Sequence, residues 1–209
     1  MNKLIILGAS GHGKVLADIA EKTGYEQIAF LDDAPDVKSC GAYPVVGKCG
    51  DASRFADADF IVAVGNAAIR RRLQTGLAEQ GLRVVSLVHP AAVVAGHVSI
   101  GAGTAVMAGA VINPYVSIGE GCIINTCASV DHDCVLEDYV HVSVGAHVAG
   151  TVHVGSATWI GAGAVVSNNI DITQECMIGA GAVVVRNLVQ SGTYIGVPAR
   201  KYDRSGDAK

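Results

Sequence analysis

One short segment, Asp131-His132-Asp133, places an imidazole between two carboxylates. Histidine titrates close to neutral pH, so His132 could accept a proton from an amine or a hydroxyl at physiological pH. A neighbouring carboxylate orients such a ring and raises its basicity, and either Asp131 or Asp133 could supply it. Because Asn125 and His141 lie nearby in the sequence, we expect one polar site here with His132 as its base. The alternative is a solvated surface turn.

A second segment, Gly8-Ala9-Ser10-Gly11-His12-Gly13, has the chemistry of a phosphate-binding turn. It joins the apolar run 4–7 to an amphipathic segment, and free NH groups at the start of a helix attract a phosphate. A second apolar run, 28–31, ends at Asp32-Asp33, where a ribose hydroxyl is usually held. Each feature alone could be a tight turn or a solvated pair. In this order they favour a site for one nucleotide.

A gapless repeat must position the histidines of the second half. Every sixth residue from Val88 to Val184 is Val, Ile or Leu, at 17 consecutive positions. A period of six fits neither an α-helix nor a coiled coil, and it predicts a parallel β-helix with three hexads in each coil. Residues 18 apart would then stack. The residue after each aliphatic anchor is often Gly, Asn or Asp, and we expect a left-handed backbone at that position.

Three histidines recur within this repeat, at His141, His147 and His153. A spacing of six places them on three successive faces of the β-helix, so they cannot converge on one metal ion within one chain. A zinc site would need histidines from two subunits, as in β-helical carbonic anhydrases. We expect no metal requirement.

Residues 1–87 carry a different pattern, in which apolar runs at 4–7, 28–31, 60–64 and 84–88 alternate with helical segments. One predicted helix places Ile69, Leu73 and Leu77 on a single face. This alternation indicates a small Rossmann-like α/β domain. The predicted organisation is a nucleotide-sugar-binding domain over 1–87, a β-helix domain over 88–186 and a C-terminal extension over 187–209.

Composition narrows the function classes. The chain has 209 residues, a net charge of −4 and only 5% aromatic residues. A general nucleic-acid binder is therefore not expected, and no apolar run reaches the roughly 18 residues of a membrane helix. Six cysteines without a C-x-x-C pattern, three of them at inward-facing positions of the repeat, suggest core thiols in a reducing cytoplasm.

The combination resembles the PglD/NeuD-type sugar acetyltransferases, and the resemblance covers the whole chain. The motifs that carry it are Gly-Ala-Ser-Gly-His-Gly, Leu-Asp-Asp, Ala-Val-Gly-Asn, Asp-His-Asp-Cys within the hexapeptide run, and Gly-Val-Pro-Ala. The resemblance implies a left-handed β-helix and a homotrimer with active sites between subunits. It also implies transfer of acetyl from acetyl-CoA to the 4-amino group of a nucleotide-linked 4-amino-dideoxy sugar, with UDP as the expected nucleotide, in bacterial glycan biosynthesis.

The resemblance implies a role for each matching residue. His132 would be the general base, Asp133 or Asp131 its partner, and Asn125 a supporting residue. The groups that the resemblance places against acetyl-CoA are His141, Ala162 and Ala180. We also expect Gly150 there, because a glycine lets a long, thin ligand lie close to the backbone. The groups expected to hold the nucleotide sugar are Ser10, Gly11, His12, Asp32, Asp33 and Gly65. Three alternatives remain open, namely O-acetylation of sialic acid or another sugar, a carbonic-anhydrase-type zinc enzyme, and a non-catalytic nucleotide-sugar-binding trimer.

Overall fold

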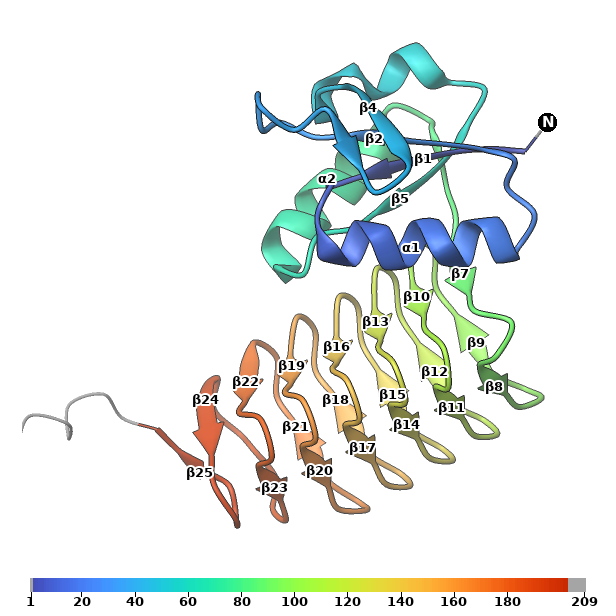
Figure 1. Cartoon of the computed structure of the whole chain (residues 1–209). Coiled ribbons are helices and arrows are strands. Elements are labelled where there is room, and N and C mark those ends of the chain that lie inside the picture. Colours follow the sequence, from blue (N-terminus) through green and yellow to red (C-terminus); the bar gives the residue numbers. More distant parts are fainter. Residues whose placement is uncertain (1, 203–209) are drawn as a thin grey trace, which may run out of the picture.

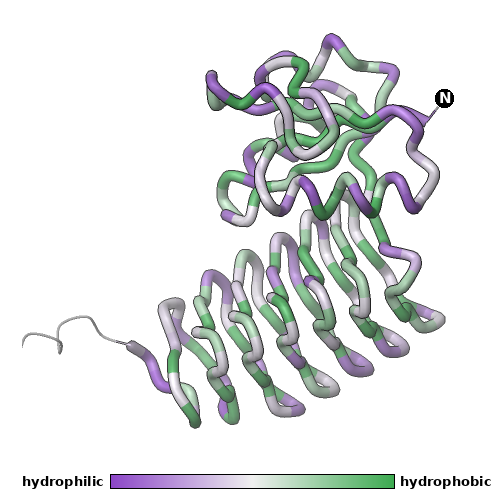
Figure 2. Tube along the Cα trace, in the orientation of Figure 1, coloured by the Kyte–Doolittle hydropathy of each residue, from purple (hydrophilic) through white to green (hydrophobic). Residues whose placement is uncertain are grey.

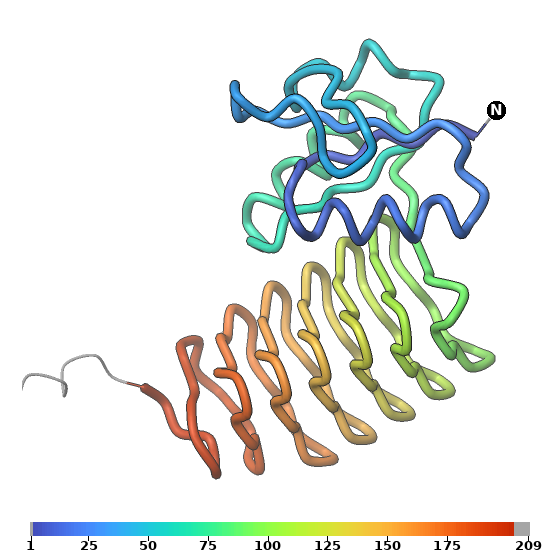
Figure 3. Tube along the Cα trace, viewed as in Figure 1, coloured from blue at the N-terminus to red at the C-terminus, as the bar shows by residue number. Residues whose placement is uncertain are grey.

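The computed structural model describes residues 2–202, so residues 203–209 of the predicted C-terminal extension lie outside it. The chain forms two parts, an α/β layer at the N-terminus and a long β-helix that begins beneath it (Figure 1). The chain passes once from the first part to the second and then advances coil by coil away from it (Figure 3).

The N-terminal part is a six-stranded sheet with the order β3-β4-β2-β1-β5-β6. Every pairing is parallel except that of β3 with β4. The strands are β1 (Lys3–Leu7), β2 (Gln27–Leu31), β3 (Ser39–Cys40), β4 (Tyr43–Gly47), β5 (Asp59–Val62) and β6 (Arg83–Val84). The helices are α1 (Gly11–Lys22), the 3-10 helix η1 (Cys49–Phe55) and α2 (Ala67–Glu79).

The central strand β1 explains why helices cover both faces of this sheet. Leu4 and Ile6 belong to the cluster that includes α1, whereas Ile5 and Leu7 belong to the cluster that includes η1 and α2. A strand that is buried on both faces has a continuous apolar sequence, as the run 4–7 has. The Rossmann-like prediction is confirmed.

The second part is a left-handed parallel β-helix of three sheets. The first sheet contains β7 (Leu87–Val88), β10 (Ala105–Val106), β13 (Ile123–Ile124), β16 (His141–Val142), β19 (Trp159–Ile160), β22 (Cys176–Ile178), β24 (Gly192–Ile195) and β25 (Arg200–Lys201). The second contains β8 (Val93–Val94), β11 (Val111–Ile112), β14 (Ser129–Val130), β17 (His147–Val148), β20 (Val165–Val166) and β23 (Val183–Val184). The third contains β9 (Ser99–Ile100), β12 (Ser117–Ile118), β15 (Val135–Leu136), β18 (His153–Val154) and β21 (Asp171–Ile172).

The predicted register is confirmed, since paired strands of the coils are offset by 18 residues, as in Ile124 opposite Val142. From Val106 onward, the aliphatic anchors and most of the small residues four positions later fill the interior as one buried cluster, whereas the anchors of the first coil are only partly buried or, at Val94, exposed. The apolar segments recur along the coils in Figure 2. We call the turn from the first to the second sheet the first corner, the next turn the second corner, and the turn back to the first sheet the third corner.

The position of the left-handed backbone differs from the prediction. Positive φ angles occur three residues after the anchor, as at Gly121, Asp133 and Tyr139, and not directly after it. Glycine follows many anchors for a different reason, which is close stacking of the coils. A Cβ on Gly101, for example, would lie 2.5 Å from the carbonyl carbon of Gly119.

The two parts pack through helix α1 and the first sheet. Leu16, Ala17 and Ala20 of α1 share a buried cluster with Leu87, Ala105 and Ile123 of β7, β10 and β13. Figure 1 shows α1 lying across the first coils. Within residues 2–202, no helix is long and apolar enough to cross a bilayer.

Candidate active site

His132 stands at the second corner, just after β14, with its side chain exposed. Its Nδ1 lies 2.7 Å from Oδ2 of Asp133. Asp131 does not bond the ring. Its Oδ1 accepts the backbone NH of His132 at 2.8 Å and the Asn113 amide at 2.7 Å. Asp133 is therefore the carboxylate that orients the imidazole, and the left-handed backbone at Asp133 belongs to this corner.

The electrostatics of this corner favour a basic imidazole. The hydrogen bond to Asp133 raises the pKa of His132 above its ordinary value of 6.5. The His132 backbone NH, followed by the Asn113 side chain, lowers the pKa of Asp131. Since a carboxylate only accepts hydrogen bonds, Nδ1 carries the proton and Nε2 has a free lone pair.

Gly150 lies directly beside that free nitrogen. It occupies the same corner position as His132, one coil later, and a Cβ built on Gly150 would be 2.6 Å from His132 Nε2. The absence of a side chain at Gly150 thus leaves the space that the ring occupies. The structure places Gly150 next to the predicted base.

A second polar group lies beneath the N-terminal part, on the outer face of the first sheet. His141 on β16 is 8% exposed, and its Nε2 lies 3.2 Å from the Asn125 amide nitrogen at the first corner. Its ring packs against Trp159 on β19 with centroids 4.5 Å apart. The indole of Trp159 is in turn held by a hydrogen bond to Ser143 Oγ at 2.6 Å.

Two ring nitrogens in this region are buried without a hydrogen-bond partner, His12 Nε2 and His141 Nδ1. Burial, followed by the positive charge of Arg70, lowers the pKa of His12 to about 4. Burial, followed by the positive charge of Arg70 and then by the electrostatic effect of His12, lowers the pKa of His141 to about 3. Both rings are neutral at pH 7. A buried unpaired nitrogen is costly, and a ligand hydrogen bond would relieve that cost.

The predicted phosphate turn has the expected form. Ser10 is the N-cap of α1 but makes no side-chain cap bond, and Gly11 at the start of the helix is open on the outside. Gly13 is required by packing, because a Cβ there would lie 2.4 Å from the Gly8 carbonyl oxygen. The first NH groups of α1 are therefore available to an anion.

The two acids after β2 have structural partners. Oδ2 of Asp32 accepts the Ala9 NH at 2.6 Å, which ties the end of β2 to the glycine turn. Asp33 Oδ1 accepts the Cys49 NH at 3.0 Å. Each carboxylate keeps acceptor positions for a ligand hydroxyl. A small cavity of about 170 Å³ adjoins both acids.

Gly65 follows β5 and opens on a larger cavity of about 410 Å³ between the two parts of the molecule. The N-terminal end of α2 lines one side of this cavity and Trp159 and Met177 line the other. Ser10, His12, Asp32 and Gly65 thus all follow strands of one sheet, at their carboxyl ends, where ligands bind in open α/β sheets.

The predicted residues do not form a single group within one chain. Asn125, Ala162 and Ala180 lie at the first corner, and the two alanines are exposed and one coil apart. His132, Asp133 and Gly150 lie at the second corner. Asn125 bonds His141 and not the His132 segment. The expected single cluster was wrong because successive hexads occupy different faces, so that only residues 18 apart stack.

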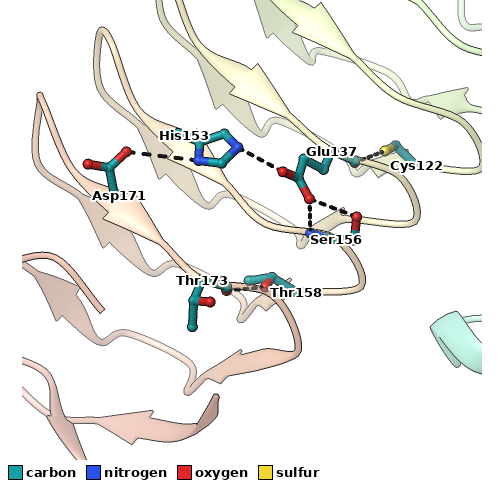
Figure 4. A network of polar contacts seen from close by, with 7 residues as sticks. All are labelled: Cys122, Glu137, His153, Ser156, Thr158, Asp171 and Thr173. Carbon is teal, nitrogen blue, oxygen red and sulfur yellow. Dashed lines mark hydrogen bonds and ion pairs between the residues drawn. The ribbon is translucent and has the colours of Figure 1, made fainter. Parts of the chain in front are cut away.

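The histidines of the alternative metal site also separate. His141, His147 and His153 lie on β16, β17 and β18, which belong to three different sheets. His153 lies between Glu137 and Asp171, with Nε2 3.0 Å from the Glu137 carboxylate, which also accepts the Ser156 hydroxyl (Figure 4). This network links neighbouring coils of the third sheet. Over the described part of the chain, no three potential metal ligands are grouped around one point.

Sequence reasoning missed Arg70, Trp159 and Asn113. Asn113 occupies the position of Asp131 one coil earlier, so the 18-residue stacking rule could have found it. The same rule places Trp159 above His141. Arg70 gave no such signal, because its partners lie far away in the sequence.

The chain is similar in sequence to known sugar acetyltransferases. Residues 3–77 match the family model described as the PglD N-terminal domain. A GDP-perosamine N-acetyltransferase from Escherichia coli O157:H7 is 30% identical over 169 residues, covering 78% of this chain and 76% of the relative. A UDP-N-acetylbacillosamine N-acetyltransferase from Bacillus subtilis is 35% identical over 113 residues, 52% of each chain.

The fold also matches a solved structure closely. The acetyltransferase domain of PglB from Neisseria gonorrhoeae, in complex with acetyl coenzyme A, superposes with a TM-score of 0.93 at 39% identity. The match covers 97% of this chain and 100% of that domain. With both parts matched in one arrangement, the chain belongs to the PglD/NeuD-type family of hexapeptide-repeat sugar acetyltransferases and is an acetyl-CoA-dependent acetyltransferase.

Proposed function

We propose that the enzyme transfers the acetyl group of acetyl-CoA to the 4-amino group of a nucleotide-linked 4-amino-dideoxy sugar, with His132 as general base. The observation that carries this proposal is the His132–Asp133 pair, in which a carboxylate 2.7 Å from Nδ1 leaves Nε2 free to accept a proton. The named relatives act on nucleotide-linked amino sugars, and one related structure holds acetyl-CoA.

The chemistry follows from these groups. The sugar amine attacks the thioester carbonyl, and its proton passes to Nε2 of His132 as the C–N bond forms. The tetrahedral intermediate collapses with cleavage of the C–S bond, and the same proton can pass from the imidazolium to the departing thiolate. Backbone NH groups at the glycine-rich corner would stabilise the oxyanion.

We assign the two substrates to different parts of the molecule. The nucleotide would lie at the carboxyl ends of β1, β2 and β5, with its phosphates at Ser10 and Gly11 and its hydroxyls at Asp32 and Asp33. Acetyl-CoA would lie along the first corner, where exposed Ala162 and Ala180 leave the backbone accessible. No metal takes part in the proposed mechanism.

The separation of the two polar groups supports a site shared between subunits. Asn125 and His141 face the N-terminal part, whereas His132 and Gly150 lie at another corner of the same chain. In a homotrimer, the second corner of one copy would meet the first corner of the next. Threefold symmetry would produce three equivalent sites from this heterologous contact.

A thiol-release assay tests the proposal. Purified enzyme is given acetyl-CoA with UDP- and GDP-linked 4-amino-dideoxy sugars and with their 4-hydroxyl analogues, and each product is identified by mass spectrometry and NMR. We expect release of CoA with at least one amino sugar and acetylation at the 4-amino nitrogen. Preference for the hydroxyl analogues would instead indicate an O-acetyltransferase. Binding without CoA release would indicate a non-catalytic protein.

A further inference from the structure

The most deeply buried charge in the described part of the chain sits between the two parts of the molecule. Arg70, in the first turns of α2, is 1% exposed. No carboxylate among the described residues forms an ion pair with it. An unpaired buried charge is costly unless hydrogen bonds compensate it, so this position calls for a specific explanation.

Four hydrogen bonds hold the guanidinium, and all go to backbone carbonyl oxygens. Nε donates to Gly121 at 2.6 Å and Nη2 to Tyr139 at 2.8 Å, both at the third corner of the β-helix. Nη1 donates to Val64 and Gly65, each at 2.8 Å, in the turn after β5. One planar side chain thus joins two adjacent coils to the turn that carries Gly65.

The β-helix side of this contact is built for it. Gly121 and Tyr139 are equivalent corner residues of neighbouring coils, and both have a positive φ. A Cβ on Gly121 would lie 2.5 Å from the Tyr139 ring, so glycine leaves the space in which that ring lies. The guanidinium carbon of Arg70 lies 5.9 Å from the ring centroid.

The Arg70 contact also bears on His12 and His141, each of which has one buried ring nitrogen without a hydrogen-bond partner. His12 comes from the N-terminal part and His141 from the first sheet, so their relative position depends on how the two parts are joined. The positive charge of Arg70 acts on both rings, adding to burial in keeping them neutral.

We propose that Arg70 is a positioning residue for acetyl transfer: by binding two carbonyls of the β-helix and two carbonyls of the Gly65 turn, it fixes that turn, and with it His12, relative to His141. This inference rests on the proposed function. A lysine could not replace it fully, because an ammonium group has three donors and no fork.

The test compares Arg70→Met and Arg70→Lys with Gln74→Met as a matched control. Gln74 lies one turn later on α2, is 3% exposed, and donates across the same boundary to the Ala102 carbonyl at 3.0 Å. Its replacement removes a boundary hydrogen bond without changing any charge. The histidines are titrated by NMR in each variant, assigned with single substitutions, and kcat/KM for the amino sugar is measured against pH.

We expect Arg70→Met to lower kcat/KM at least tenfold and to raise the pH at which His12 and His141 take up protons. In Arg70→Lys, His12 and His141 should still take up protons only at low pH, and kcat/KM should lie between those of Arg70→Met and the wild type. In Gln74→Met, His12 and His141 should titrate as they do in the wild type, and kcat/KM should stay within about twofold of the wild-type value.

Two results would overturn the proposal. One is wild-type kcat/KM and unchanged histidine titration in Arg70→Met. The other is an equal loss of activity in Gln74→Met, which would show that any boundary contact matters alike. If Arg70→Met does not fold, kcat/KM and the histidine titrations of Arg70→Lys and Gln74→Met still test whether the guanidinium matters more than an ordinary boundary hydrogen bond. An inactive wild type would refute the proposed function instead, while the titrations would still test the effect of the Arg70 charge.

Discussion

A methyl group added at Gly150 should displace the proposed base without disturbing the fold. The Cβ of Gly150→Ala would lie 2.6 Å from His132 Nε2, well inside ordinary contact distance. Gly150 has no positive φ, so alanine fits its backbone. His132 is exposed, so its ring can move aside at little cost to stability.

The size of the effect follows from this displacement. Relieving the contact moves the ring by about 1 Å, and a misplacement of that size can cost about 10²-fold in rate. Complete loss of a general base costs about 10²–10⁴-fold. We therefore expect kcat of Gly150→Ala to fall about 10²-fold. The hydrogen bond to Asp133 should weaken as well, which would lower the pKa of His132 and move the acid limb of kcat/KM to lower pH.

Steady-state kinetics of CoA release, with thermal melting alongside, measure both effects. Gly96→Ala is the matched control, because Gly96 has the same corner position three coils earlier and nothing would lie within 4 Å of a Cβ added there. It should keep wild-type kcat. A wild-type kcat in Gly150→Ala would contradict the displacement of the base. A rise in only the KM for acetyl-CoA would also contradict it, because Gly150 would then contact the coenzyme and not the base.

Three other perturbations test the site and the fold. Asp133→Asn removes the carboxylate that raises the pKa of His132, so the base should stay unprotonated, and activity should persist, to lower pH. A pH–rate profile tests this, with Asp131→Asn as the control variant that leaves the contact between His132 and Asp133 intact. His12 and His141 have pKa values of about 4 and 3 in the folded chain and the ordinary value of about 6.5 when unfolded. The free energy of unfolding should therefore fall as the pH is lowered from 6.5 to 4, by up to about 1.4 kcal/mol per pH unit for each histidine. Urea unfolding at several pH values measures this decrease, and a free energy that does not change with pH would contradict the burial of these rings. Treatment with a chelator should leave kcat unchanged, because His141, His147 and His153 lie on three separate sheets; loss of activity restored by zinc would contradict this.

The β-helix could be predicted in detail because its information is local and repeated. A single hydrophobic position every six residues determines both the strand and its inward face, and stacking at 18 residues then fixes the register. The same rule shows why Asn125 and His132 separate, since seven residues carry the chain to the next corner.

The boundary between the two parts could not be predicted, because it depends on contacts between distant segments. Ile69, expected on the buried face of α2, is 40% exposed, whereas Arg70 and Gln74 are buried. A helix face that packs on corner carbonyls needs hydrogen-bond donors and not aliphatic side chains. Hydrophobic periodicity cannot detect such a face. For the same reason, the electrostatic influence of His12 on His141 was visible only in the structure.

Acetylation of a nucleotide-linked 4-amino sugar by the wild type and by His132→Ala, compared under identical conditions with product analysis by mass spectrometry, tests the central claim most directly. We predict an N-acetylated product from the wild type and a kcat lower by about 10²–10⁴-fold in the variant, with unchanged thermal stability. A variant that acetylates the amine at the wild-type rate would contradict the assignment of His132 as the base.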